Sequence, residues 1–360
     1  MKYIDEYRNS DIIKKYIEKI KLISEKKINI MEICGGHTVA IHKSGFHELF
    51  KKNINFLSGP GCPVCVTSTA DIDKIIYLST QLNSILCIYG DLLKVPGSKS
   101  SLMIEKASGA DIRVVYSVHD ALNLALTAAN KTVYFAGIGF ETTAPLSAAA
   151  VLEAEQKNIK NFKLLSLHKT VAPAIRVLLG DADNEIDAFI LPGHVSSVTG
   201  ESAYNFISEQ YSKSAVITGF EPLDIISSVY HIISMHEQKK NKIINNYKRA
   251  VKPQGNLKAQ EILNLVFDNC GTEWRGLGMI ENSGLRLKNK FSKYDAEKNM
   301  DFPKNIFLKN TGCICSEILT GKKKPFECVL FDEICNPDNP AGACMVSNEG
   351  ACGAYYKYKK

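Results

Sequence analysis

The sequence predicts an α/β fold with two similar parallel-sheet units and a third, mostly helical and irregular domain. Three observations lead to this prediction. From residue 28 onward, short apolar runs alternate with helical stretches, the pattern of parallel sheets covered by helices. Short motifs recur along this region at one constant spacing. After residue 311 cysteine, proline and glycine dominate, so something other than apolar burial must order that segment.

The composition excludes several classes of protein. The chain has 360 residues, 45 % hydrophobic and 23 % charged, which fits two or three globular domains. It has no run of about 18 apolar residues, and residues 1–27 lack a signal peptide's apolar segment, so we expect a cytoplasmic protein without a membrane span. The net charge of +6 is spread over short basic runs, which argues against a nucleic-acid partner. Because structural disulfides are rare in the cytoplasm, the eleven cysteines indicate metal binding or redox chemistry.

The expected elements follow from the periodicity of apolar residues. Isoleucines at helical spacing predict an amphipathic helix over residues 11–26. Strands are expected at 28–33, 54–57, 84–89, 112–116, 132–136, 162–167, 186–191 and 215–218, and helices between them at 70–82, 119–129, 145–156 and 172–179. We assign residues 28–130 to the first α/β domain, 131–236 to the second, and 1–27 plus 237–360 to the third.

An internal repeat supports this division. Three motif pairs are each separated by 132 residues: Thr38-Val39-Ala40 and Thr170-Val171-Ala172, Pro60-Gly61 and Pro192-Gly193, Val66-Thr67 and Val198-Thr199. The repeat places His194 at the position that matches Cys62. Ligands of open α/β sheets bind outside the carboxyl ends of the strands, where both Pro-Gly turns are expected, so His194 is a candidate for a shared cleft as well as for a structural turn.

Cys34 and His37 form the first candidate site. They lie where an expected strand runs through a glycine turn into a helix. A helix N-terminus stabilises a thiolate, which makes Cys34 a candidate nucleophile or metal ligand. His37 could accept a proton or act as a second ligand. The alternatives are a buried apolar cysteine and a histidine that bonds to the turn.

Cys62 and Cys65 form the second candidate site, a CxxC turn at the end of the next strand. If the strands before Cys34 and Cys62 are neighbours, three thiols meet at one sheet edge. Three soft ligands with an open position suit iron, copper or zinc. Alternatively, Cys62 and Cys65 cycle between dithiol and disulfide and supply electrons to chemistry at Cys34.

A glycine-rich turn forms the third candidate site, at residues 137–145. It has only a G-x-G spacing, which matches neither the dinucleotide nor the P-loop pattern. We therefore expect a turn that presents Glu141, Thr142 and Thr143 to the same cleft.

The C-terminal cysteines are the most specific signal. Cys313, Cys328, Cys335 and Cys352 come from an irregular segment and can supply the four thiolates of a [4Fe–4S] cluster. Structural zinc is the rival, but it prefers paired CxxC knuckles, which this segment lacks. Cys315 and Cys344 remain and could form a redox-active pair beside the cluster.

Several motifs in this chain resemble those of the HypD family of hydrogenase maturation factors. They are Cys34-Gly35-Gly36-His37-Thr38, Gly59-Pro60-Gly61-Cys62-Pro63-Val64-Cys65, Gly90-Asp91-Leu92-Leu93-Lys94-Val95-Pro96-Gly97-Ser98, Gly139-Phe140-Glu141-Thr142-Thr143-Ala144-Pro145, Pro192-Gly193-His194-Val195-Ser196, Trp274-Arg275-Gly276-Leu277-Gly278 and Cys344-Met345-Val346-Ser347-Asn348-Glu349-Gly350-Ala351-Cys352. The resemblance extends from about residue 28 to the C-terminus.

This resemblance implies a scaffold with redox activity rather than a turnover enzyme. The family builds the Fe(CN)2CO unit of [NiFe]-hydrogenases in complex with HypC, with cyanide delivered by HypE and the hydrogenase large subunit as indirect partner. By resemblance Cys34 holds the iron, with Cys62 and Cys65 as ligands or as a redox couple. The tail cysteines hold the cluster, and Cys315 and Cys344 relay electrons.

One position departs from the family pattern. The family usually has a second histidine after the threonine, where this chain has Val39, and His42 is only a weak substitute. Two other functions remain open from the residues alone. One is a stand-alone iron–sulfur disulfide oxidoreductase, and the other is a zinc-structured binding module, which would not need the Cys34 and Cys62 sites.

Overall fold

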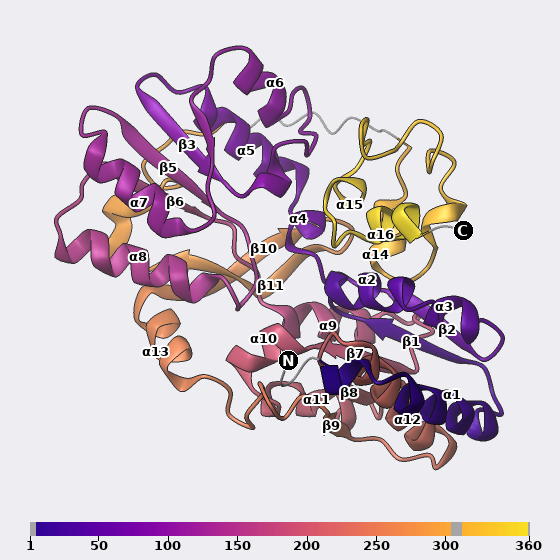
Figure 1. Cartoon of the computed structure of the whole chain (residues 1–360). Helices are drawn as coiled ribbons and strands as arrows, with labels where there is room; N and C mark the ends of the chain where they lie inside the picture. The colour runs from indigo at the N-terminus through magenta and orange to yellow at the C-terminus, as the bar shows by residue number, and fades with distance from the viewer. Residues whose placement is uncertain (1–4, 304–311, 359–360) are drawn as a thin grey trace.

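The computed structural model describes residues 5–303 and 312–358. Two lobes, each built on a parallel sheet, lie beside a short C-terminal tail (Figure 1). The expected α/β class with two parallel sheets and a cysteine-bearing helical C-terminal region is confirmed. Residues 1–4, 304–311 and 359–360 of the expected third domain lie outside the described residues. In the part of the chain that is described, no helix is both long and apolar enough to cross a membrane.

The first lobe contains a five-stranded sheet. Its strands are parallel and run in the order β2 (Ile54–Ser58), β1 (Ile28–Glu32), β7 (Ala188–Pro192), β8 (Ser214–Thr218), β9 (Ile243–Asn245). One apolar core joins this sheet to the helices α1 (Ser10–Ile23), α2 (Gly35–Lys43), α3 (Phe46–Leu49) and α12 (Pro222–Glu237). The short elements on this lobe are η1 (Asp5–Arg8), α10 (Gly193–Thr199), η3 (Ser202–Tyr204) and α11 (Asn205–Glu209).

The second lobe contains a four-stranded sheet. Its parallel strands run in the order β4 (Ile112–Val114), β3 (Ser84–Ile88), β5 (Thr132–Gly137), β6 (Phe162–Ser166). One core packs α7 (Val118–Thr127) and α8 (Ala144–Gln156) on this sheet. A second core joins the sheet to α5 (Thr69–Ser79) and α6 (Leu102–Ala107) and continues to α9 (Val171–Gly180), α4 (Pro63–Val66) and η2 (Gly90–Leu92).

The expected division of the strands at residue 130 is wrong. β3 pairs with β5 across that point, and β1 pairs with β7, which comes more than 150 residues later. The chain therefore leaves the first sheet after β2, builds the second sheet, and returns at β7. Apolar runs predict strands but not their partners, because any buried parallel strand looks alike in sequence. The two Pro-Gly turns of the repeat consequently follow strands β2 and β7 of the same sheet, and not strands of two different sheets.

The expected third domain is also distributed differently. α1 packs on α12 of the first lobe, because its isoleucine stripe completes that core. The antiparallel hairpin of β10 (Phe267–Trp274) and β11 (Gly278–Leu287), with α13 (Leu257–Val266) and η4 (Asn289–Tyr294), packs on the second lobe. Sequence periodicity missed this hairpin, which carries a bulge between Cys270 and Thr272.

The tail is built from short elements. They are α14 (Cys315–Leu319), η5 (Pro325–Glu327), α15 (Ala343–Val346) and α16 (Ala351–Tyr358). α16 packs on α2 of the first lobe and α15 packs on α4. The tail therefore touches the two segments that carry the cysteines of the first two candidate sites.

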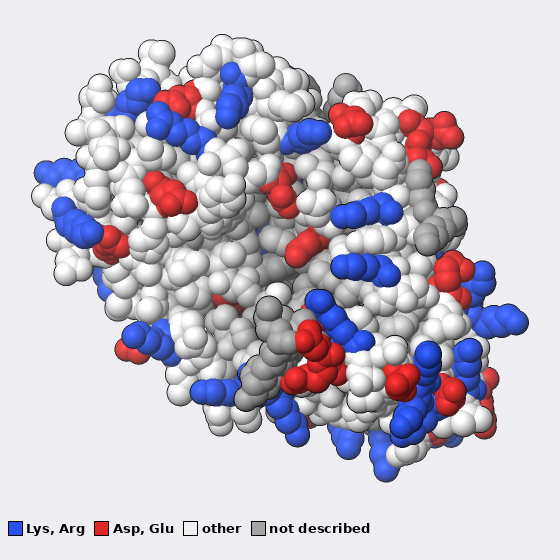
Figure 2. Space-filling view, in the orientation of Figure 1, with Lys and Arg blue, Asp and Glu red and all other residues white. Residues whose placement is uncertain are grey.

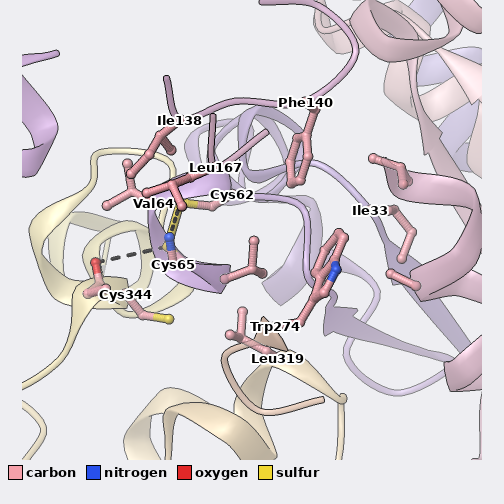
Figure 3. Close-up of a cluster of buried hydrophobic side chains, with 14 of the residues drawn as sticks. Ile33, Cys62, Val64, Cys65, Ile138, Phe140, Leu167, Trp274, Leu319 and Cys344 are labelled. Atoms are coloured by element: carbon pink, nitrogen blue, oxygen red, sulfur yellow. Dashed lines mark hydrogen bonds between the residues drawn. A yellow bond between two sulfur atoms is a disulfide. The ribbon is translucent and has the colours of Figure 1, made fainter. Parts of the chain in front are cut away.

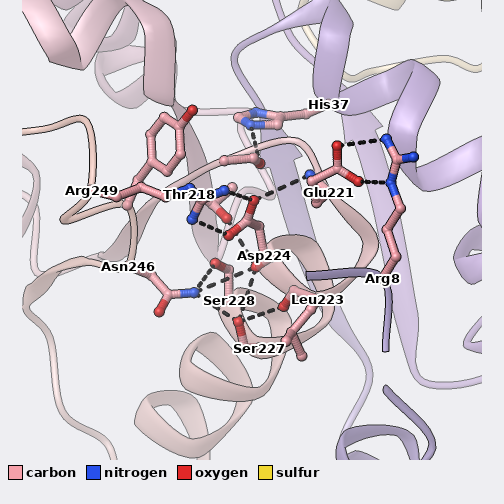
Figure 4. A network of polar contacts seen from close by, with 12 residues as sticks. Arg8, His37, Thr218, Glu221, Leu223, Asp224, Ser227, Ser228, Asn246 and Arg249 are labelled. Carbon is pink, nitrogen blue, oxygen red and sulfur yellow. Dashed lines mark hydrogen bonds and ion pairs between the residues drawn. The ribbon is translucent and has the colours of Figure 1, made fainter. Parts of the chain in front are cut away.

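A buried ion pair fixes the end of the first sheet. The Arg249 guanidinium donates to both carboxylate oxygens of Asp224, at 2.8 and 2.5 Å (Figure 4). Asp224 is 1 % exposed and also accepts the amide N–H of Glu221, while Arg8 pairs with the Glu221 side chain. This network ties η1 to the start of α12, next to the turn at Gly219 whose carbonyl oxygen is bonded to His37.

Candidate functional site

A cavity of about 280 Å³ lies at the carboxyl ends of strands from both sheets. It is lined by Ile33, Cys34, Gly61, Pro63, Val64, Tyr89, Asp91, Leu92, Ile138, Gly139, Phe140, Thr142, Thr143, Pro192, His194, Val195 and Glu349. These residues follow β1, β2, β3, β5 and β7, and Glu349 comes from the tail. The space-filling view shows a hollow between the lobes with acidic side chains in it (Figure 2). The cavity thus occupies the position where open α/β sheets bind ligands.

Cys34 stands at the wall of this cavity, directly before α2. The amide N–H of Gly35 donates to Gly61 O at 3.2 Å, and a Cβ on Gly61 would lie 2.2 Å from the Cys34 nitrogen. The strand end of Cys34 and the CxxC turn therefore pack backbone against backbone. The strands before Cys34 and the CxxC turn are neighbours, so the condition for a shared sheet edge is met.

The ionisation of Cys34 differs from the sequence expectation. Burial raises the pKa of its thiol to about 12, and the carboxylates of Glu349 and Glu32 act in the same direction. The helix N-terminus lowers the pKa, but burial outweighs it. A metal cation that displaces the proton would reverse this balance, since metal binding to a thiol releases its proton.

His37 does not line the cavity. Its Nε2–H donates to Gly219 O at 3.1 Å (Figure 4). Its ring stacks on Phe220 with centroids 4.5 Å apart. Burial lowers the pKa of His37 to about 3, so the ring is neutral. Of the two alternatives that the sequence left open, this contact matches the histidine that bonds to a turn, here the turn after β8, and a role of His37 at Cys34 stays a prediction.

His194 lines the cavity, as the repeat predicts. Its ring stacks on Phe220, the same ring on which His37 stacks, with centroids 4.1 Å apart. Burial lowers the pKa of His194. A neutral imidazole at the cavity wall can accept or donate a proton to a bound ligand.

Cys62 and Cys65 are joined by a disulfide and lie behind the cavity wall. The Cys65 N–H donates to Cys62 Sγ at 3.2 Å, which caps the short helix α4. Both cysteines are almost fully buried, and the apolar side chains around them include Val64, Ile138 and Leu167 (Figure 3). The backbone of the turn reaches the cavity, whereas the sulfur atoms lie in the core.

The glycine-rich turn after β5 presents its threonines to the cavity but not Glu141. The Glu141 carboxylate accepts the Val171 N–H at 2.9 Å at the start of α9, and its second oxygen is buried with no partner among residues 5–303 and 312–358. Burial raises the pKa of Glu141 to about 7. Contrary to expectation, Glu141 is not among the residues that line the cavity, because its carboxylate is bound by the free N-terminal amide of α9.

Cys315 and Cys344 lie together, with their sulfur atoms 2.7 Å apart. Ala343, next to Cys344, places its carbonyl oxygen 3.9 Å from Cys65 Sγ (Figure 3). The tail pair predicted from sequence is therefore a pair in space, and it adjoins the CxxC disulfide.

The other tail cysteines are grouped around this pair. Cys328, Cys335 and Cys352 are buried and Cys313 is half-buried. Burial raises the pKa of Cys352, and the thiolates of Cys313, Cys328, Cys335 and Cys315 raise it further. Such a crowd of thiolates is unfavourable without positive charge, which the iron of a cluster supplies, so these residues fit a [4Fe–4S] group. In the described chain, no three His, Cys, Asp or Glu side chains are close enough together to hold a single metal ion. A four-iron cluster does not require this, because each of its cysteines binds a different iron.

Sequence reasoning assigned no role to Asp91 and Glu349, which line the cavity. Ser347 joins them: its hydroxyl donates to Asp91 Oδ2 at 3.1 Å and accepts the Glu349 N–H at 3.2 Å. Burial raises the pKa of Glu349, and the Asp91 carboxylate raises it further. Only their positions in the sequence could have indicated a role in the cavity. Asp91 follows strand β3, and Glu349 lies between Cys344 and Cys352.

Comparison with known proteins gives a consistent result. The family profile described as "HypD: Hydrogenase formation hypA family" matches residues 11–359. Hydrogenase maturation factor HypD of Escherichia coli strain K12 is 42 % identical over 368 aligned residues, covering 100 % of this chain and 99 % of that protein. The proteins of the same name from Rhodobacter capsulatus and Cupriavidus necator are 41 % and 40 % identical, covering 99 % of this chain and 98 % and 97 % of their own lengths.

Proposed function

This chain belongs to the HypD family of hydrogenase maturation factors, and from that premise we propose that it is the scaffold for the Fe(CN)2CO unit of [NiFe]-hydrogenases. In this proposal the chain acts in complex with HypC and receives cyanide from HypE, and the hydrogenase large subunit is the later recipient. Cys34 holds the iron that is the cargo of the assembly.

The observation that supports this proposal is the position of Cys34. It stands at the wall of a cavity that both sheets, the CxxC turn and the tail enclose. Because its raised pKa keeps the proton on the thiol, Cys34 carries charge only when a cation binds. Iron binding at Cys34 would therefore release one proton, and His194 and Glu349 at the cavity wall are placed to accept it.

Cyanide release requires two electrons. A cyanide group carried on a partner's sulfur leaves as CN⁻ when a thiolate of the reduced Cys62–Cys65 pair attacks that sulfur, and a mixed disulfide forms. The second thiolate of the pair then displaces the partner's thiol, and the pair becomes a disulfide. The turn must open toward the cavity for this step, because both sulfur atoms are buried.

The reduced Cys62–Cys65 pair is regenerated by the tail pair. Reduced Cys344 attacks the Cys62–Cys65 disulfide, and Cys315 resolves the mixed disulfide, which moves two electrons to the CxxC turn. The carbonyl next to Cys344 already touches Cys65 Sγ. Cys313, Cys328, Cys335 and Cys352 would hold the [4Fe–4S] cluster, which supplies single electrons at low potential when bound.

The test is anaerobic co-purification with HypC. We expect tail cluster iron plus additional iron with cyanide and CO infrared bands, and we expect Cys34→Ser to remove the additional iron and the bands while the cluster stays. Zinc in the tail in place of iron would refute the cluster assignment. Loss of the cluster in Cys34→Ser would refute the separation of the two sites.

A second function is favoured by the position of the CxxC disulfide, whose Cys65 Sγ lies 3.9 Å from the carbonyl oxygen of Ala343, the residue before Cys344 of the tail pair. A stand-alone disulfide oxidoreductase would use the same two pairs on an external disulfide. Turnover of a disulfide substrate without HypC, and unaffected by Cys34→Ser, would support that function and not the scaffold.

A further inference from the structure

A second cavity of about 640 Å³ lies away from Cys34, between α6 and the tail. Its walls come from the loop 94–101, the start of α6, the hairpin turn at Arg275, and the tail. Cys313 and Cys315 both reach this cavity. Two of the tail cysteines therefore border a cavity that opens to the outside of the molecule.

The charge of this cavity is positive. Among the described residues that line it, Lys94, Lys99 and Arg275 are cations, and Asp338 is the one carboxylate. The Arg275 guanidinium donates through Nε to Thr67 O and through Nη1 to Thr69 Oγ1. Its Nη2 is buried, and within the described residues it has no hydrogen-bond partner. A buried donor without a partner is costly, so an anionic group that enters the cavity gains a ready contact.

Apolar surface accompanies this charge. Met103 and Ile104, in the first turn of α6, line the cavity and are 45 % and 54 % exposed. A mixed patch of cations and exposed apolar side chains over a redox centre is typical of small, transient electron-transfer interfaces.

We propose that this cavity is the docking site of a small acidic electron-carrier protein. The site consists of Lys94, Lys99, Arg275, Met103 and Ile104. A carboxylate on the carrier pairs with these cations, and its redox group then lies over Cys313 and Cys315. One electron leaves the reduced carrier and enters the iron–sulfur group of the tail, with no bond made or broken.

This inference rests on the proposed function, because it needs the tail cysteines to hold a redox group. It adds the class of partner and the face to which that partner binds. The cavity at Cys34 takes no part in it.

The test is binding of an oxidised [2Fe–2S] ferredoxin, as acidic probe, to the full chain with its tail cluster, measured by titration calorimetry. We expect binding at low salt that weakens strongly at high salt, because the contact is electrostatic. The double variant Lys94→Glu, Lys99→Glu should raise Kd about tenfold or more at low salt. The control variant Lys239→Glu, Lys240→Glu makes the same change in net charge at exposed positions of the first lobe and should stay within about twofold.

A second measurement follows the colour of the tail cluster in a stopped-flow instrument. Reduced ferredoxin should reduce the Lys94→Glu, Lys99→Glu variant more slowly than the wild type, whereas the methyl viologen radical cation should not be slowed. Equal Kd values and equal rates for both double variants would overturn the docking site. So would reduction of the Cys315–Cys344 pair by a thioredoxin-type dithiol protein under conditions in which ferredoxin neither binds the chain nor reduces its cluster.

The two proposals can fail separately. Cys34→Ser should bind ferredoxin like the wild type. If iron-unit assembly is absent while ferredoxin docks as expected, the scaffold proposal fails alone. If assembly proceeds normally in the Lys94→Glu, Lys99→Glu variant and docking is unaffected, the docking proposal fails alone.

Discussion

Gly35→Ala should detach the tail from the cavity without touching any cysteine. Gly35 is the first residue of α2, and a Cβ there would lie 1.9 Å from Glu349 O and 2.7 Å from the Glu349 carbonyl carbon. Backbone cannot yield as the end of a flexible side chain can, so the loop that carries Glu349 must move. Because this loop forms one wall of the cavity, its movement opens the cavity.

The size of the effect follows from two opposing terms. Overpacking typically costs about 1–3 kcal/mol, while alanine stabilises a helix over glycine by at most about 1 kcal/mol. Docking of the loop should thus weaken by roughly 1–2 kcal/mol, which corresponds to about a tenfold larger open population. In the open state Cys34 is hydrated, so its pKa falls toward that of a free thiol.

The assay is the alkylation rate of Cys34 by iodoacetamide, read by mass spectrometry on protein that keeps its tail cluster. We expect about a tenfold faster rate in Gly35→Ala than in the wild type. Gly180→Ala is the matched control, since a Cβ there meets no atom within 4 Å. An unchanged rate in Gly35→Ala would show that the tail does not close the cavity over Cys34.

Two further predictions concern the tail and Glu141. Cys328→Ser should abolish the iron–sulfur absorption and lower the melting temperature by roughly 5 °C or more, because metal binding contributes folding energy; a variant with unchanged absorption would exclude Cys328 as a ligand. Burial raises the pKa of Glu141 from 4.5 in the unfolded chain to about 7 in the fold. The contribution of its protonated carboxyl to folding stability is therefore complete below pH 4.5 and is lost as the pH rises to about 7. Glu141→Gln should therefore lose less stability than the wild type between pH 5 and 8, by at most about 3 kcal/mol in urea unfolding; parallel pH profiles of the two proteins would contradict the buried state of this carboxyl.

The elements of this fold could largely be predicted from sequence, but their pairing could not. All eight expected strands are present within about two residues, because buried parallel strands are continuous apolar runs. Which strands pair depends on the return of the chain at β7, and nothing local in the sequence encodes that return. The β10–β11 hairpin was missed because Asp268, Asn269 and Cys270 interrupt its apolar pattern.

The candidate site shows the same division between local and tertiary information. Cys34, the CxxC turn and His194 were predicted to converge, and the structure brings Cys34, the turn backbone and His194 to one cavity. His37 and Glu141 have the same local signals, yet their side chains point to Gly219 O and to the start of α9. Those partners lie 182 and 30 residues away, so sequence proximity to a glycine turn could not decide between cavity and core.

The interleaving of the two sheets has a consequence for the order of folding. Cys34 and the CxxC turn are synthesised early, but β7, which flanks β1 and closes the cavity from the other side, is made only after the whole second sheet. A ribosome-bound chain that ends before β7 thus carries these thiols on a two-stranded fragment without its central partner, and such fragments are marginally stable. The cysteines of the first candidate sites therefore stay open to oxidants and stray metals during synthesis, and the cavity comes into existence only as the last part of the chain is added.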